Sequence, residues 1–184
     1  MRATELLKEE HKRIKLVMNI LEEICKRFQS GEKVSSEHLE QIVEFFKNFA
    51  DKCHHAKEED FLFPEMEKVG ISREGGPIGC MLSEHDQGRA LVKELSVAIM
   101  RYKIGEKATD RIVENANEYI GLLRQHIDKE DNVLYMMADQ HLSEETQKKL
   151  LEDFEKVEVE RIGVGTHEKF HKLLHHLKDV YLIN

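Results

Sequence analysis

Apolar residues recur along most of the chain at the spacing of one helical face, in segments separated by short breaks. In the first segment, Leu7, Ile14, Val17, Leu21 and Ile24 fall close to one stripe. The sequence shows no strand-like alternation and no Asn-Gly hairpin signal. The pattern therefore predicts helices over residues 3–29, 36–64, 78–104, 109–138, 144–160 and 166–182.

Capping residues, proline and glycine mark where these helices should begin and end. Thr4 is suited to cap the first helix. Pro64 should end or bend the second, although the apolar pattern continues weakly to Val69. Residues 70–79 hold four glycines and one proline, so we expect a loop that joins two halves. The sequence GVG at residues 163–165 should separate the last two helices.

These elements predict an all-α protein. Four long helices with short connections favour an up-down-up-down four-helix bundle over residues 1–138. Residues 139–184 should form additional C-terminal helices packed on the same domain. A chain of 184 residues is long enough to bury a core of its own without disulfides.

Composition and charge narrow the classes of partner. The net charge of −8 argues against a nucleic-acid-binding surface, which needs clustered Lys and Arg. No apolar run approaches the roughly 18 residues that span a bilayer, and the N-terminal segment has no apolar signal core. We therefore expect a cytoplasmic protein in which Cys25, Cys53 and Cys80 are reduced thiols. The sequence identifies no protein partner.

The chain repeats one arrangement of metal-binding residue types. His54 and Glu58 form a His-x-x-x-Glu pair in CHHAKEEDFLFP, and His126 and Glu130 form another in QHIDKEDNVLYMM. Because residues four apart lie on the same helical face, each pair can point toward one ion. A single histidine precedes each pair at almost the same distance along the chain, and these two are His11 and His85. One such pair on a charged helix is ordinary surface, but two matched sets predict a shared two-metal centre.

The residues also set the stoichiometry of this centre. Four imidazoles and two bridging carboxylates would give each of two metals two nitrogens and two oxygens, with a position left for a small ligand. Nitrogen and oxygen ligation suits iron better than calcium or magnesium, while manganese and zinc remain possible. Two ionised glutamates in a bundle interior would otherwise repel each other and lose hydration.

At these residues the chain resembles the hemerythrin-like, or HHE cation-binding, family. The stretches that carry the resemblance are EEHKRI, HHAKEEDFLFP, EHDQGR and HIDKEDNVLY, and it covers residues 1–138. The resemblance implies a four-helix bundle with a non-haem di-iron centre. Its ligands would be His11, His54, Glu58, His85, His126 and Glu130, with both glutamates bridging.

One departure from the oxygen-carrying members bears on function. They have a His-x-x-x-His pair on the third helix, where this chain has His85 and Arg89, and a longer spacing to the last carboxylate. The site is thus more similar to the four-His, two-Glu centre of proteins that repair iron centres. This shifts the expected ligand from stored oxygen toward nitric oxide, peroxide or iron.

Several nearby residues have two interpretations. His55 and Glu59 could support the ligands, be alternative ligands themselves, or form surface or interhelical hydrogen bonds. Glu84 and Asp86 could orient His85 or lie on the surface. Tyr119 could lie above the site or in the core, and Cys53 could be a ligand, a redox thiol or apolar filler. The C-terminal THEKFHKLLHHL could form a second metal site, cap the bundle or be a half-exposed face; its histidines are His167, His171, His175 and His176.

The repeated motifs are compatible with three classes of function. The first is a protein that binds or senses oxygen, nitric oxide or peroxide at a di-iron centre. The second is an oxidoreductase, or an iron-donating repair factor, that consumes nitric oxide or peroxide. The third is an interaction module whose metal only stabilises the fold, which would close the site to added ligands. Whether the protein is an enzyme stays open.

Overall fold

The computed structural model describes residues 1–163 and 165–183, which are helical almost throughout and contain no strand. The prediction of an all-α protein is therefore confirmed. The first half contains α1 (Ala3–Gln29), α2 (Ser36–Phe45), η1 (Phe46–His55), η2 (Glu58–Leu62) and α3 (Phe63–Lys68). The rest contains α4 (Pro77–Lys103), α5 (Thr109–Lys129), η3 (Glu130–Leu134), α6 (Tyr135–His141), α7 (Glu144–Val157), η4 (Glu158–Ile162) and α8 (Thr166–Tyr181). The η segments are π-helical turns within longer helical rods.

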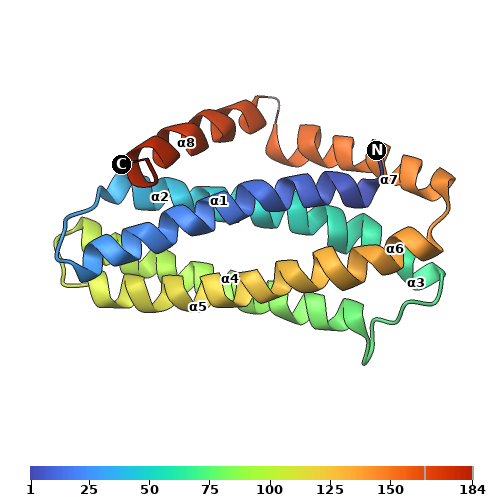
Figure 1. Ribbon diagram of the computed structural model, residues 1–184, viewed down its shortest axis with the longest axis horizontal. Helices are drawn as coiled ribbons and strands as arrows, with labels where there is room; N and C mark the ends of the chain where they lie inside the picture. Colours follow the sequence, from blue (N-terminus) through green and yellow to red (C-terminus); the bar gives the residue numbers. More distant parts are fainter. Residues whose placement is uncertain (164, 184) are drawn as a thin grey trace.

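Four rods form an antiparallel bundle (Figure 1). They are α1, the run from α2 to α3, α4, and the run from α5 to α6. α4 packs against α5, α5 against α1, and α2 against α4. The short connections make each rod antiparallel to the next. In this arrangement each helix buries its one apolar face and leaves its charged face exposed.

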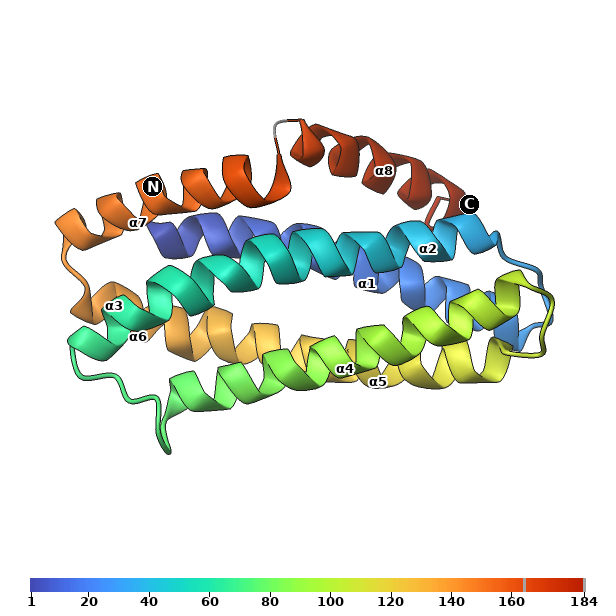
Figure 2. The same cartoon turned by 180° about the vertical axis from the view of Figure 1, so that it is seen from behind.

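The C-terminal helices lie along the outside of this bundle (Figure 2). α7 contacts α1 and η2, η4 contacts η1, and α8 contacts α1. Gly163 and Gly165 take positive φ angles of 90° and 85°, which glycine adopts without steric cost. The predicted GVG break also includes residue 164, which lies outside the described residues. A domain division at residue 138 stays a prediction.

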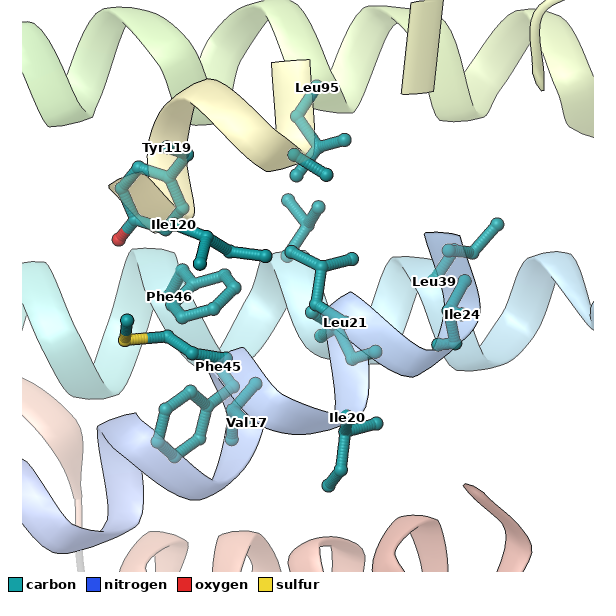
Figure 3. Packing of buried hydrophobic residues seen from close by; sticks show 14 of the residues in the cluster. Val17, Ile20, Leu21, Ile24, Leu39, Phe45, Phe46, Leu95, Tyr119 and Ile120 are labelled. Atoms are coloured by element: carbon teal, nitrogen blue, oxygen red, sulfur yellow. The ribbon is translucent and has the colours of Figure 1, made fainter. Parts of the chain in front are cut away.

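Two apolar clusters form the core and leave a polar layer between them. The larger cluster includes Phe46, Leu95 and Ile120 from three different rods (Figure 3). The smaller one includes Leu7, Phe63 and other residues at the opposite end of the bundle. Among the described residues, none of the helices is both long enough and apolar enough to cross a membrane.

The predicted cap of the first helix is wrong. Thr4 lies inside α1 and its hydroxyl donates to Asp139 Oδ1 at 2.7 Å, while Arg2 takes the N-cap position. At Pro64 the rod does not end but continues to Lys68, as the weak continuation of the apolar pattern to Val69 indicated. The π-helical turn of η2 comes directly before α3, so Pro64 stands in a first turn, where its missing N–H costs little.

Candidate metal centre

Four buried histidines face one another in the polar layer between the two clusters. Their side chains are at most 3% exposed, and they come from four different rods: His11 in α1, His54 in η1, His85 in α4 and His126 in α5. The Nε2 atom of His11 lies 2.9 Å from that of His54. In the other half, the Nε2 atoms of His85 and His126 are 3.1 Å apart.

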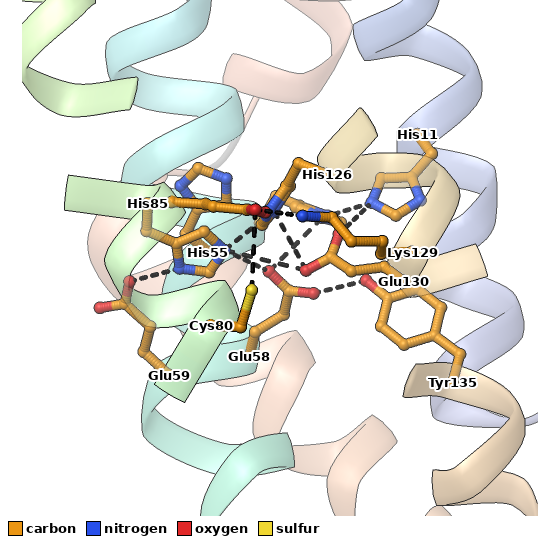
Figure 4. A network of polar contacts seen from close by, with 12 residues as sticks. His11, His55, Glu58, Glu59, Cys80, His85, His126, Lys129, Glu130 and Tyr135 are labelled. Carbon is orange, nitrogen blue, oxygen red and sulfur yellow. Dashed lines mark hydrogen bonds and ion pairs between the residues drawn. The ribbon is translucent and has the colours of Figure 1, made fainter. Parts of the chain in front are cut away.

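Two fully buried carboxylates lie between these pairs (Figure 4). Glu130 Oε2 is 3.2 Å from His11 Nε2, and Glu130 Oε1 is 3.1 Å from His126 Nε2. Glu58 Oε2 lies 3.5 Å from His85 Nε2 and 3.7 Å from His54 Nε2. Each glutamate therefore reaches both histidine pairs, so each could bridge two ions held by these pairs. The structure brings all six predicted residues together, while their role as metal ligands stays a prediction.

The outward nitrogen of each histidine contacts its own carboxylate. The four Nδ1 contacts are His11 with Asp131 at 2.7 Å, His54 with Glu10 at 2.8 Å, His85 with Glu59 at 2.6 Å, and His126 with Glu84 at 2.9 Å. An ionised carboxylate only accepts hydrogen bonds, so Nδ1 carries the proton in each ring. In the neutral ring, Nε2 then presents a lone pair to the centre of the site, as metal-bound histidines do.

These outer carboxylates follow the internal repeat. Glu10 directly precedes His11 but binds His54, and Glu84 directly precedes His85 but binds His126. Likewise, the residue after each inner glutamate binds the early histidine of the other half: Glu59 contacts His85, and Asp131 contacts His11. The two halves of the sequence thus form a pseudo-two-fold arrangement. In it, each rod supplies a carboxylate that contacts the Nδ1 atom of a histidine on another rod.

The donor atoms of the centre suit a pair of cations. Two Nε2 lone pairs about 3 Å apart repel each other unless a positive group lies between them, and ligands about 2.1 Å from one ion have this mutual spacing. Glu58 Oε2, Glu130 Oε1 and Glu130 Oε2 have no hydrogen-bond donor although all are buried. Two cations would satisfy these oxygens and the four nitrogens at once.

Comparison with known families agrees with this geometry. Residues 2–138 match the model of the hemerythrin HHE cation-binding domain. The chain belongs to this family. The resemblance inferred from the repeated motifs is therefore confirmed over the four-helix bundle.

Relatives of this HHE chain include proteins with and without a stated activity. It is 24% identical over 162 residues to the uncharacterized protein Rv1995 of Mycobacterium tuberculosis, a match that covers 88% of this chain and 63% of that protein. It is 39% identical over 89 residues to the iron-sulfur cluster repair protein YtfE of Salmonella newport, covering 46% of this chain and 40% of that protein. The chain thus spans less than two thirds of these relatives. No solved structure matches it.

Burial and charge set opposite pKa directions for the two inner glutamates of the HHE centre. Burial and the neighbouring charge of Glu130 raise the pKa of Glu58 well above its usual value. Burial also acts to raise the pKa of Glu130, but contacts with three imidazoles outweigh it, and that pKa lies well below the usual value. Of the two carboxyl groups, Glu58 therefore holds a proton more tightly than Glu130.

Tyr135 is part of this centre although sequence reasoning assigned it no role. Its hydroxyl donates to Glu58 Oε1 at 2.5 Å, and its ring stacks on that of His11 with centroids 5.6 Å apart. In the other half, Phe63 holds the corresponding place and stacks on His85 at 6.1 Å, without a hydroxyl. Comparison of the aligned stretches KEEDFLF and KEDNVLY, which end in Phe63 and Tyr135, could have identified this residue from the sequence.

His55 is a second difference between the two halves of the centre. It is 6% exposed, its ring stacks on His85 with centroids 3.8 Å apart, and one of its nitrogens lies within 4.8 Å of nitrogens of His85 and His126. The corresponding residue of the other half is the apolar Ile127. The half of the centre at His85 and His126 thus has an additional imidazole that the other half lacks.

The outer contact of His85 differs from the pair considered for it. Glu84 binds His126, and the exposed Asp86 pairs with Arg89 at 3.0 Å. Glu59 orients His85 instead, because helical rotation carries the residue after Glu58 toward α4. Arg89 donates to Glu59 at 2.7 Å, so the side chain in place of the carriers' second histidine supports an outer carboxylate.

A buried lysine ties the C-terminal helices to the His54 side of the centre. Lys57 Nζ lies 2.5 Å from both Glu10 Oε1 and Glu158 Oε1, and its side chain is 0% exposed. Burial acts to raise the pKa of Glu10, but the hydrogen bond from His54 and the charge of Lys57 lower it to about 2. Burial lowers the pKa of His54 to about 4, so this ring is neutral and ready to accept a cation.

Two other candidates lie outside the proposed ligand set. Tyr119 is in the larger apolar cluster, with its ring edge-on to Phe46 at 4.9 Å. Burial raises the pKa of the Cys53 thiol to about 12, and its sulfur lies 3.8 Å from His167 Nε2. The position of Tyr119 favours core packing. Cys53, Glu158 and His167 bring three donor atoms within 4.8 Å of one another, so the interpretation of Cys53 as a ligand stays a prediction.

Proposed function

We propose that the HHE domain holds two iron ions and that this centre binds a small ligand, namely oxygen, nitric oxide or peroxide. The ligands would be His11, His54, Glu58, His85, His126 and Glu130. The observation that supports this most is the pairing of four Nδ1 atoms with carboxylates, which leaves four Nε2 atoms facing two glutamates whose inner oxygens have no donor. Manganese or zinc could bind the same nitrogen and oxygen atoms, but this ligand set favours iron.

The protein side chains would hold, orient and shield this centre. The two glutamates would bridge, and the outer carboxylates would keep every imidazole in one tautomer. The apolar clusters on either side exclude bulk water, which strengthens each electrostatic contact. When bound, the two irons would supply redox-active positions that accept a small ligand.

The two halves of the centre should differ in how they receive a ligand. The Tyr135 hydroxyl can hold a proton at Glu58, and His55 adds a hydrogen-bonding ring beside His85. A small cavity of about 120 Å³ is lined by His55, Gly88, Arg89 and Tyr119 among other residues. We infer that a small ligand would approach through this cavity toward the His85 and His126 side.

A second candidate function is repair of damaged iron–sulfur clusters. The similarity to YtfE favours it, and the four-His, two-Glu ligand set without the carriers' extra histidine agrees with it. Restored activity of an enzyme with an oxidatively damaged cluster, measured with and without this protein, would support repair. Unchanged recovery would count against it.

Metal analysis of protein produced without added metal tests the primary proposal. We expect two irons per chain, and the reduced protein should change its absorption spectrum with oxygen, nitric oxide or peroxide. A stable, reversible oxygen adduct would favour carriage, and rapid oxidation without an adduct would favour a redox role. A chain without iron, or no spectral response to all three ligands, would overturn the proposal.

A further inference from the structure

A cavity separate from the proposed metal centre lies between α8 and the bundle. Its volume is about 350 Å³, and none of the six proposed ligands lines it. Its floor consists of aromatic and aliphatic side chains from α2, η1 and α8, including Phe45, Phe49, Phe170 and Leu174. Phe45 stacks on Phe49 with centroids 4.8 Å apart, so the floor is a packed apolar surface.

The rim of this cavity is basic in a chain whose net charge is −8. Arg13 and Lys12 come from α1, Lys178 comes from α8, and no Asp or Glu of the described chain lines the cavity. The Arg13 guanidinium lies 5.9 Å from the Phe49 ring centroid, so its charge is held above the apolar floor. Lys12 is paired with Glu9 at 2.5 Å, so the attraction of this rim for an anion comes mainly from Arg13 and Lys178.

The C-terminal histidines complete this rim. His171 and His175 are one turn apart on α8, and their Nε2 atoms lie 3.3 Å from each other at the cavity. Each of these rings can donate a hydrogen bond to an anion above the floor. His167 also lines the cavity, whereas His176 does not and lies edge-on to His38, with ring centroids 5.5 Å apart.

We propose that this cavity binds a small amphiphilic anion: one carboxylate head on a hydrocarbon or aromatic body of about ten carbon atoms, a size that such a cavity accommodates. The apolar body lies on Phe45, Phe49 and Phe170, and the carboxylate lies between Arg13 and Lys178. Bidentate hydrogen bonding by the Arg13 guanidinium selects a planar carboxylate head.

Displacement of the fluorescent probe 8-anilinonaphthalene-1-sulfonate by decanoate tests this proposal. Decanoate should displace the probe, whereas uncharged decanol should do so about tenfold less well and decyltrimethylammonium not at all. Equal displacement by decanoate and decanol would show a merely apolar groove and overturn the proposal. So would an absence of probe or decanoate binding.

A pair of double variants separates the cavity from general charge. Arg13→Gln with Lys178→Gln should weaken decanoate binding by at least about tenfold. Arg111→Gln with Lys148→Gln removes the same charge from exposed positions outside the cavity and should leave binding unchanged. Equal weakening by both doubles would overturn the proposal. Unchanged metal content and unfolding in all variants would separate this result from a failure of the metal centre.

Discussion

Each inward-facing imidazole of the centre depends on a carboxylate on its outer side. The Nδ1 contacts of 2.6 to 2.9 Å determine the tautomer of every ring. Tyr135 also supports the centre, because its ring stacks on that of His11. At the scale of single residues, loss of an inner group and loss of an outer group should therefore have different effects. The first should remove metal, and the second should leave a buried partner unsatisfied.

Substitution of an inner ligand should empty the centre. His54→Ala or Glu58→Ala should lower the metal content from two ions to one or none, and the melting temperature of the metal-loaded protein should fall. Elemental analysis and thermal unfolding measure both effects. His141→Ala is a matched control, because that exposed ring bonds the Met137 carbonyl oxygen away from the centre. Two bound metals in either ligand variant would mean that the ligands are wrongly assigned.

Loss of the Tyr135 hydroxyl should destabilise the metal-free protein. Tyr135→Phe leaves Glu58 Oε1 without its donor in a fully buried place, at a cost of about 1–3 kcal/mol by urea unfolding. It should also alter the absorption spectrum of the metal-loaded form. Tyr102→Phe removes a hydroxyl that donates to the Val34 carbonyl oxygen, so it should leave that spectrum unchanged. An unaltered Tyr135→Phe spectrum would place this hydroxyl outside the centre's chemistry.

At the scale of elements, the C-terminal helices make the two related rods unequal. Lys57 and Lys129 hold equivalent places before the inner glutamates, and each contacts the outer carboxylate of its own half, Glu10 or Glu84. Lys129 is 40% exposed, whereas Lys57 is 0% exposed. The difference arises because α7 and η4 cover only the first half, with Phe154 and Glu158 over Lys57.

Removal of the buried lysine charge should be far more costly than removal of an exposed one. Lys57→Met leaves Glu10 buried without its cation and should destabilise the protein by about 3–5 kcal/mol in urea unfolding. Lys156→Met is the control, because that lysine is 64% exposed and pairs with Asp153, so little or no loss of stability is expected. Equal losses in the two variants would show that the buried network adds no special stability.

At the scale of the whole molecule, the buried charges tie stability to pH. The pKa of Glu10 is lowered from 4.5 to about 2 in the fold. A carboxyl whose folded pKa is depressed stabilises the protein above its unfolded pKa, and this contribution is lost as the pH falls through the folded pKa. Between pH 4.5 and about 2, the metal-free protein should therefore lose about 3 kcal/mol from this group.

Urea unfolding at a series of acidic pH values measures this loss. Glu10→Gln cannot titrate, so its stability should fall less steeply over the same range. The comparison needs metal-free protein, because a bound cation would change the protonation of the centre. Parallel curves for the two proteins would contradict a depressed pKa at Glu10.

The amino-acid sequence by itself determined the helices, the bundle and the six inner residues. Helical periodicity needs only local spacing, and the repeated His-x-x-x-Glu pairs place donors on one face whatever the neighbours are. The exceptions were local competitions, as at Thr4, whose hydroxyl binds Asp139 from another rod instead of capping its own helix.

Only the tertiary structure decided which residues support the inner six. Contacts between rods depend on rotation and depth, which sequence spacing does not specify, so the pairing of Glu84 with His126 was not predictable from its place beside His85. The burial of Lys57 likewise depends on where η4 lies over η1. The cavity between α8 and the bundle depends on where α8 packs. Residues that share one helical face could therefore be predicted from the sequence, whereas the contacts between helices that support them could not.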